Sequence, residues 1–219
     1  MSEHIVERKP RPRDRVLIRL SGGRFFAIPE EAAAPLVVGA ELSDEDVERL
    51  ARIDLYLRGR DKAMRMLAIR GRSRREIDDA LRAIGVDDPV RRGILSELEE
   101  TGLVDDARFA REFVSVKKDV RRLGPHRLRA DLQKLGVGRA DLDGALATFD
   151  TDEQQRLARA LAERAVRDGP VDEKAVRRVA SMLTRKGFDY SVVNRIAAEL
   201  ARRMERGASD PEWTAPDDA

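Results

Sequence analysis

The sequence contains no cysteine, which excludes disulfide bonds, thiolate metal sites, iron–sulfur clusters and thiol nucleophiles. Aromatic residues make up only 4% of the chain, so its core must be aliphatic, as is typical of helices packed on helices. No run approaches the roughly 18 apolar residues of a membrane span, and the charged N-terminus lacks the apolar core of a signal peptide. We therefore expect a soluble, cytoplasmic protein with no membrane partner.

An excess of one charge is also lacking, although 38% of the residues are charged. The chain has 43 Lys and Arg against 41 Asp and Glu, so a basic surface can arise only from segregation of the charges. Residues for catalysis or metal binding are scarce: the two histidines, His4 and His126, are far apart, and Asp105-Asp106 is typical of a helix N-terminus. We expect no enzyme activity, no metal and no cofactor.

The N-terminal region carries the only strand signals. The apolar runs Val16–Leu20 and Phe25–Ile28 are joined by Gly22-Gly23, a pattern that predicts a β-hairpin because glycine tolerates the positive φ of a tight turn. Leu36–Val38 is a candidate for a third short strand. The basic stretch before the hairpin, residues 1–14, is predicted to be a flexible tail.

From Ser43 onward the signals are helical. Capping-box spacing occurs at Ser43 with Asp46, at Ser73 with Glu76 and at Thr151 with Gln154. Glycines, Gly124 among them, follow many apolar periodic segments, as helix C-caps do. Tyr190 is expected to pack at the start of the last helix. The predicted helices span residues 44–58, 61–70, 73–84, 88–101, 105–122, 125–135, 139–149, 152–168, 172–186 and 189–206.

A threefold recurrence organises these helices. Gly85, Gly136 and Gly187 are 51 residues apart, and apolar residues precede and follow each glycine at the same distances. The equivalent positions are Ile77, Leu128 and Val179; Leu81, Leu132 and Leu183; Val86, Val137 and Phe188; Ile94, Ala145 and Ile196; and Leu98, Phe149 and Leu200. Because the recurrence includes glycines in register, it favours true repeats over a chance match of amphipathic helices.

The predicted fold is mainly α: three tandem three-helix repeats form an elongated, curved rod, with a small N-terminal β-hairpin element. Its expected parts are a flexible tail at 1–14, the hairpin element at 15–42, helical repeats at 43–104, 105–150 and 151–206, and a disordered acidic tail at 207–219. Stacked helical repeats present long surfaces, which suit a large partner better than an enclosed substrate.

Basic residues gather near the first-to-second helix junction of each repeat or on its second helix, where stacking could align them into a stripe. The candidate partner-binding residues are Arg70, Arg72, Arg74, Arg75, Lys117, Lys118, Arg121, Arg122, Arg127, Arg129, Lys134, Arg185 and Lys186. For any single Arg, a solvated face paired with Asp and Glu is the favoured alternative. The middle group favours binding, because only Asp119 and Asp131 oppose the bases between Lys117 and Arg139.

Four segments carry a resemblance to a known family. Gly102–Ala110 (GLVDDARFA) resembles the G-L-[LI]-[DN]-D-x-x-[FY]-A signature of bacterial RecX proteins, and Leu123–Val137 is similar to the K-G-x-x-R-I-x-x-E-L-x-x-K-G-I segment of that family. Arg70–Leu81 and Arg185–Val193 resemble two further family elements. Leu123, Asp131 and Leu135 depart from the pattern, and Leu135 replaces a common lysine.

The resemblance implies the three-helix repeats again and a function. Family members bind the RecA recombinase, especially its filament on single-stranded DNA, and inhibit its recombinase, ATPase and coprotease activities, which modulates DNA repair and the SOS response. We expect a monomer that acts in this way. Two alternatives stay open: a protein that binds single- or double-stranded DNA directly through its basic stripe, and a helical adaptor for an unrelated partner.

Overall fold

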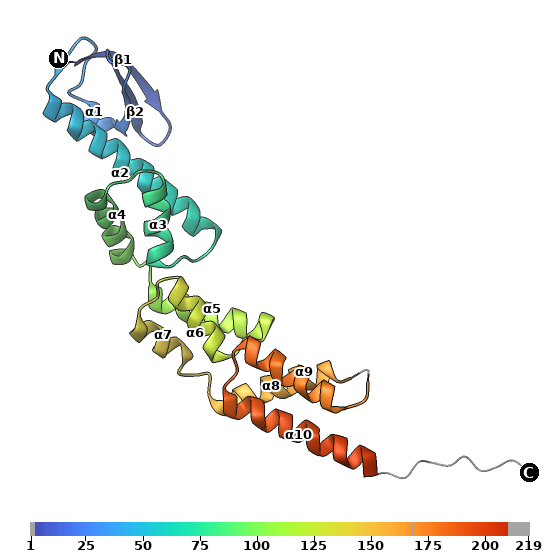
Figure 1. Cartoon of the computed structure of the whole chain (residues 1–219). Coiled ribbons are helices and arrows are strands. Elements are labelled where there is room, and N and C mark those ends of the chain that lie inside the picture. The colour runs from blue at the N-terminus through green and yellow to red at the C-terminus, as the bar shows by residue number, and fades with distance from the viewer. Residues whose placement is uncertain (1–2, 168, 210–219) are drawn as a thin grey trace, which may run out of the picture. The chain divides into compact units, whose positions relative to one another are not determined.

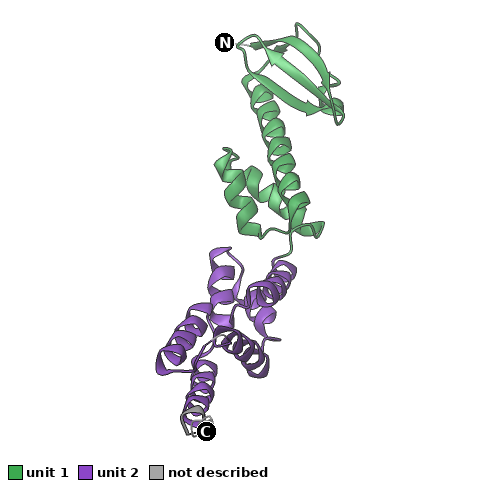
Figure 2. Ribbon diagram, turned by 90° about the vertical axis from the view of Figure 1, so that its right-hand side faces the viewer, with its two compact units in different colours: residues 1–105 green, residues 106–219 purple. Residues whose placement is uncertain are grey.

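The computed structural model describes residues 3–167 and 169–209, which form four strands and ten helices (Figure 1). They divide into two compact units, residues 1–105 and 106–219 (Figure 2). The predicted acidic tail lies outside the described residues from residue 210 onward, whereas its first three residues, 207–209, belong to the last helix. Among the described residues, no helix combines the length and apolar character needed to cross a membrane.

Unit 1 begins with an antiparallel sheet of four strands in the order β3-β2-β1-β4. The predicted hairpin is confirmed by β2 (Arg15–Leu20) and β3 (Phe25–Pro29), with Gly23 at φ 83° in the turn. The predicted third strand at Leu36–Val38 is wrong, because the remaining short strand is β4 (Glu41–Leu42).

The predicted flexible tail at 1–14 is also wrong, because β1 (Glu3–Arg11) occupies most of it. This strand pairs with β2 from Ile5 to Arg11 and places Ile5 in the core, fully buried. The basic composition suggested disorder, but backbone hydrogen bonds to β2 and one well-placed isoleucine hold the segment in the sheet.

The sheet is fixed to the helix that follows it. Helix α1 (Glu30–Ala33) and the start of α2 (Asp44–Ile69) contribute to a common core with the strands. Arg15 forms a bidentate ion pair with Asp61 of α2, at 2.7 and 3.0 Å, and the Ala27 amide donates to the Asp54 carboxylate at 2.8 Å. The sheet and α2 therefore form one body.

Helix α2 is continuous where two helices, 44–58 and 61–70, were predicted. The helix-weakening Gly59 is buried against α4 (Asp88–Glu100), and a Cβ at this position would lie 2.6 Å from Ile94 Cδ1. The absence of a side chain at Gly59 lets α2 pack closely against α4, and α2 continues through this position without a break. The capping box of Ser43 with Asp46 that starts α2 is confirmed.

The threefold repeat is confirmed in the packing. Repeat 1 consists of α2, α3 (Arg74–Ala83) and α4, repeat 2 of α5 (Asp106–Arg121), α6 (Pro125–Lys134) and α7 (Arg139–Leu146), and repeat 3 of α8 (Thr151–Ala165), α9 (Glu173–Lys186) and α10 (Tyr190–Ser209). All fifteen apolar residues at the equivalent positions are buried. The three glycines have φ of 79°, 78° and 84°, so each turns the chain in the left-handed conformation that favours glycine.

Three local expectations differ from the structure. The N-cap of α8 is Asp150, whose carboxylate accepts from the Glu153 amide, rather than Thr151. Gly124 starts α6 as its N-cap and does not end α5. Tyr190, expected to pack at the start of the last helix, is 77% exposed.

Candidate partner-binding surface

The predicted basic residues of repeat 1 are engaged within unit 1. Arg70 and Arg72 both reach the Glu76 carboxylate, at 2.6 and 3.0 Å, and Glu76 also closes the capping box with Ser73. Burial of Glu76 favours its neutral form, but the hydrogen bonds from Arg70, Ser73 and Arg72 outweigh this effect, so the pKa of Glu76 is lowered. These two arginines therefore hold the turn between α2 and α3.

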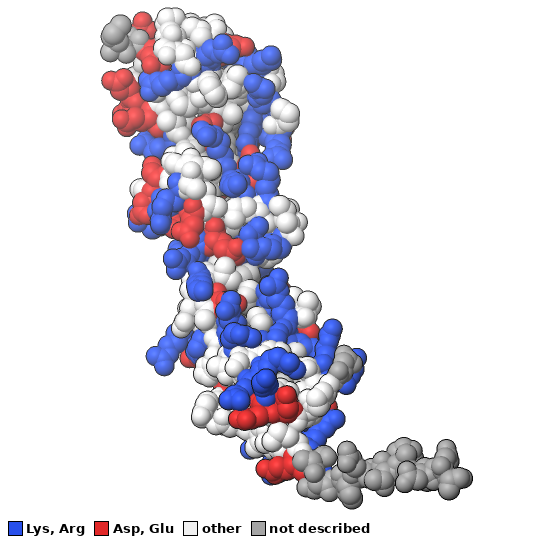
Figure 3. Space-filling model, turned by 45° about the vertical axis from the view of Figure 1, so that its right-hand side comes forward, with Lys and Arg blue, Asp and Glu red and all other residues white. Residues whose placement is uncertain are grey.

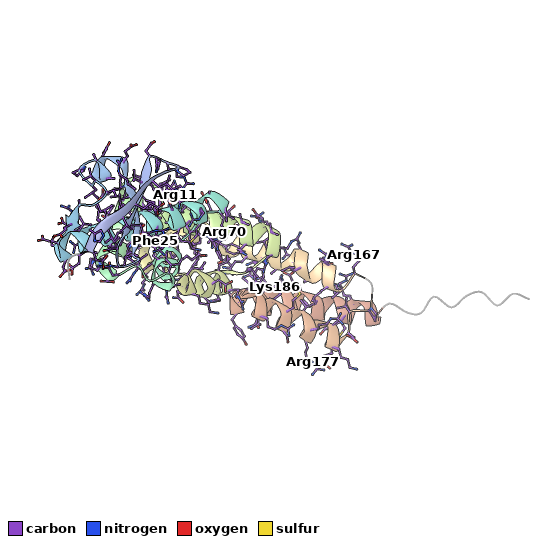
Figure 4. The ribbon with its side chains drawn as sticks, turned by 90° about the horizontal axis from the view of Figure 1, so that it is seen from above. Arg11, Phe25, Arg70, Arg167, Arg177 and Lys186 are labelled. Carbon is purple, nitrogen blue, oxygen red and sulfur yellow. The ribbon has the colours of Figure 1, made fainter. Side chains whose placement is uncertain are left out.

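The other two predicted residues of repeat 1 are paired as well. Arg74 forms an ion pair with Glu99 at 2.7 Å, and Arg75 lies 3.7 Å from Asp79, one helical turn away. Arg70, labelled in Figure 4, directly follows the last residue of α2. For this cluster, the interpretation as a solvated face with acidic partners fits the contacts.

Several predicted residues of repeat 2 also have structural partners. The ammonium of Lys118 lies 2.7 Å from Glu153 at the start of α8 and 5.7 Å from the centre of the Phe149 ring. Arg127 pairs with Asp131, and Arg129 pairs with Asp143 at 2.7 Å, which lowers the pKa of the Asp143 carboxyl.

Repeats 2 and 3 meet through backbone atoms. The Gly124 amide donates to the Lys186 carbonyl at 2.8 Å, and the His126 amide donates to the Gly187 carbonyl at 3.0 Å. A Cβ on Gly124 would lie 2.3 Å from the Gly187 oxygen, and a Cβ on Gly187 would lie 2.3 Å from the Arg127 nitrogen. Only glycine at both positions permits this contact, so the end of α9 is held directly against the start of α6.

This contact brings together basic residues that the sequence places in separate groups. The Lys186 ammonium donates to the Arg121 carbonyl at 2.8 Å, which joins the C-terminal ends of α5 and α9. We name the resulting group the seam cluster; its members are Lys117, Arg121, Arg122, Arg127, Arg185 and Lys186. Figure 3 shows how Lys and Arg side chains are distributed over one face of the molecule, and Figure 4 labels Lys186 within unit 2.

The seam cluster differs from the cluster of repeat 1 in its pairing. Arg121, Arg122 and Arg185 form no ion pair with any residue between 3 and 209 that the structure describes. Part of this basicity stabilises helices, because a cation in the last turn of α5 or α9 offsets the negative end of the helix dipole by roughly 0.3–1 kcal/mol. Lys134 does not join the cluster, since it lies at the far end of α6.

Sequence reasoning missed two apolar residues beside the seam cluster. Val116 and Val120 of α5 are 58% and 77% exposed, although they continue the stripe that begins with Phe109 and Phe113. Phe109 is buried and Phe113 is partly covered. The spacing of three and four residues along α5 was the available signal. An exposed apolar pair next to cations suits a protein surface better than phosphates, which offer valine no favourable contact.

Comparison with protein-family models places two of the repeats. Residues 105–146 match the model for the second three-helix domain of RecX, and residues 152–196 match the model for the third. These boundaries agree with repeats 2 and 3 of the structure.

Individual relatives and solved structures give the same picture. The chain is 33% identical to the "Regulatory protein RecX" of Mycolicibacterium vanbaalenii over 65% of its own length and 83% of that protein. It is 34% identical to that of Geobacillus kaustophilus over 77% of its own length, but spans only 63% of this longer relative. A crystal structure titled "regulatory protein RecX" superimposes with a TM-score of 0.68 at 26% identity, covering 90% of this chain and 99% of that one.

Proposed function

The chain belongs to the RecX family of regulatory proteins, and we propose that it binds the RecA recombinase filament on single-stranded DNA and inhibits its recombinase, ATPase and coprotease activities. It would thereby modulate DNA repair and the SOS response in the cytoplasm. The observation that carries this proposal is the seam cluster with Val116 and Val120 beside it, an exposed apolar and cationic surface on α5, α6 and α9.

The physical basis is that apolar anchors and unpaired cations act on different parts of binding. Burial of exposed valine contributes about 25 cal/mol for each Å² of apolar area removed from water. Cations without an internal partner attract acidic groups and raise the association rate. A protein bound across neighbouring RecA subunits would restrict the relative motion that the ATPase cycle requires, because it would favour one conformation over the others.

The decisive experiment measures ATP hydrolysis by RecA on single-stranded DNA as this protein is added. We expect inhibition near stoichiometric amounts and co-sedimentation with the filament. The variant Arg121→Ser/Arg122→Ser/Arg185→Ser should bind the filament about 10- to 100-fold more weakly, which corresponds to about 1.4–2.8 kcal/mol. No effect of the unsubstituted protein at stoichiometric amounts would refute the proposal.

The same samples test direct DNA binding by the helical repeats. If the seam cluster served phosphates, the triple variant would lose affinity for DNA without RecA, and the affinity would fall steeply with salt. We expect the triple variant to retain any DNA binding of the unsubstituted protein while it loses affinity for the filament.

A further inference from the structure

The N-terminal sheet carries a basic surface of its own, far in sequence from the seam cluster. Between Arg8 and Arg24 there are seven Lys and Arg and a single acid, Asp14. Four of these cations have acidic partners: Arg13 and Arg15 with Asp61, Arg19 with Glu7, and Arg24 with Glu3. The side chains of Arg8, Lys9 and Arg11 are exposed and form no ion pair or hydrogen bond with any described residue.

The strand register decides which of these side chains share a face. Lys9 pairs with Leu17 and Arg11 with Arg15, while Arg19 pairs with Phe25. Because directly paired residues, and residues two apart on a strand, lie on the same side of a sheet, Lys9, Arg11, Arg19 and Phe25 share one face. The same face holds Glu7, which neutralises Arg19, and the buried Leu17 and the Asp61-paired Arg15 on β2. The opposite face carries Val16, Ile18 and Leu20, which are buried in the core.

Phe25 is an unusual residue on this face. This residue is 65% exposed, although the neighbouring Phe26 is buried in the core. Figure 4 labels Phe25 and Arg11 on the same small sheet. The register places Phe25 level with Glu7 of β1, so Lys9 and Arg11 lie two and four residues further along that strand. With adjacent strands about 4.8 Å apart and a rise of about 3.4 Å per residue, Phe25 is about 12 Å from Lys9 and about 17 Å from Arg11, a distance within the span of a few nucleotides.

We propose that this sheet face binds single-stranded nucleic acid, with Lys9 and Arg11 on phosphates and Phe25 stacked on a base. A cationic track beside an exposed aromatic ring is the arrangement that sequence-tolerant single-strand binding requires. The sheet can act as a rigid platform, since Arg15 and Ala27 tie it to α2. This activity goes beyond RecA binding and does not depend on it.

Protection of an edge strand accounts for only part of the pattern. The side of β1 that faces away from β2 is paired with β4 only at Glu3 and His4, and charges with Pro10 on such an open edge discourage aggregation. That role calls for charge at the edge alone. It does not call for an exposed phenyl ring on β3, which would itself promote association.

The test uses the full chain without RecA, so its outcome is separate from that of the proposed function. Fluorescence anisotropy of labelled oligothymidylate is followed over a salt series. For Lys9→Ser/Arg11→Ser, the slope of log affinity against log salt should decrease in magnitude by about 1.4, which is 0.7 for each lost phosphate contact. Phe25→Ala should weaken binding about tenfold and leave that slope unchanged.

Two matched controls come from the same unit. Arg49→Ser/Arg52→Ser removes two exposed cations of α2 that pair with Asp46 and Glu48, and its slope should match that of the unsubstituted protein. Arg8→Ser removes a cation of β1 that points to the other side of the sheet. Equal losses in Arg8→Ser and Lys9→Ser would overturn the proposal, because binding would then follow the edge and not the face.

Two further results would also overturn it. Unchanged oligothymidylate binding by Phe25→Ala, with duplex DNA of the same length bound equally tightly, would exclude a stacking platform. Loss of binding to phosphatidylserine vesicles in Lys9→Ser/Arg11→Ser, with oligothymidylate binding retained, would identify a membrane surface as the ligand.

Discussion

The basic clusters of repeat 1 and of the seam look alike in sequence and differ in structure. Arg70 and Arg72 share Glu76, and Arg74 reaches Glu99, so these cations join helices within unit 1. At the seam, Arg121, Arg122 and Arg185 project from helix ends without an acidic partner among the described residues. Local density of Arg and Lys therefore does not identify a binding surface. Whether acidic residues pair with these cations decides whether the cations are available to a partner.

The largest expected effect concerns the glycine that holds the seam. Gly187→Ala should lower the free energy of unfolding by about 3 kcal/mol, because a Cβ adds the strain of a left-handed residue to a clash 2.3 Å from the Arg127 backbone. Gly85→Ala is the matched control: its φ is 79°, but a Cβ there meets nothing within 4 Å, so about 1 kcal/mol is expected. Denaturant unfolding measures both, and equal losses would show that the seam contact is not needed.

The second prediction compares the two clusters directly. Arg121→Ser/Arg122→Ser/Arg185→Ser should weaken filament binding about 10- to 100-fold with little change in stability. Arg70→Ser/Arg72→Ser/Arg74→Ser should lower the free energy of unfolding with little change in filament binding, because it removes ion pairs that hold α2, α3 and α4 together. Co-sedimentation and denaturant unfolding on both triple variants check this, and an equal loss of filament binding would show that the two clusters do not differ in function.

The third prediction concerns the acid side of the repeat 1 network. The pKa of Glu76 is lowered in the folded chain, so its contribution to stability is present above its unfolded value of 4.5 and is lost as the pH falls through the folded value. Glu76→Gln should lower the free energy of unfolding at pH 7 by about 2 kcal/mol and make unfolding less dependent on pH below about 4.5. Urea titrations at several pH values measure this. The prediction is contradicted if the unsubstituted protein and Glu76→Gln lose the same free energy of unfolding as the pH falls.

The smallest effect is expected at Tyr56, whose hydroxyl donates to Glu97 and so links α2 to α4. Burial and the neighbouring carboxylate raise the pKa of Tyr56 to about 12. A raised pKa means that this stability is present below the unfolded value of 10 and is lost as the pH rises through about 12. Tyr56→Phe should lower the free energy of unfolding by about 1 kcal/mol. In an absorbance titration that follows tyrosinate formation, Tyr190→Phe should keep the ionisation that occurs at the higher pH, and Tyr56→Phe should lose it.

Much of the helical fold could be predicted because its signals are local. The 51-residue recurrence located three buried faces and three left-handed glycines, since a helix face and its closing turn depend on residues close in sequence. Predictions based on composition or on single residues were weaker. The basic segment now in β1 was predicted to be a tail, and two helices, 44–58 and 61–70, were predicted where α2 is continuous. A partner strand decides the first case and a facing helix the second.

The candidate surface was predictable only in part. The sequence favoured the middle basic group, and this preference stays a prediction. The sequence could not show that Lys118 turns toward Glu153, that Lys134 stands apart, or that Arg185 and Lys186 join Arg121. Val116 and Val120 were missed, because an apolar stripe does not reveal how far along the helix it is covered.

The sequence by itself determined the repeat, its glycine turns and its aliphatic core, and the resemblance in four of its segments indicated the family. The tertiary structure alone decided which cations are paired and which are exposed, because an ion pair depends on residues up to tens of positions apart. The backbone contact of Gly124 with Gly187 joins the ends of α5 and α9, which are distant in sequence, and so creates the seam cluster.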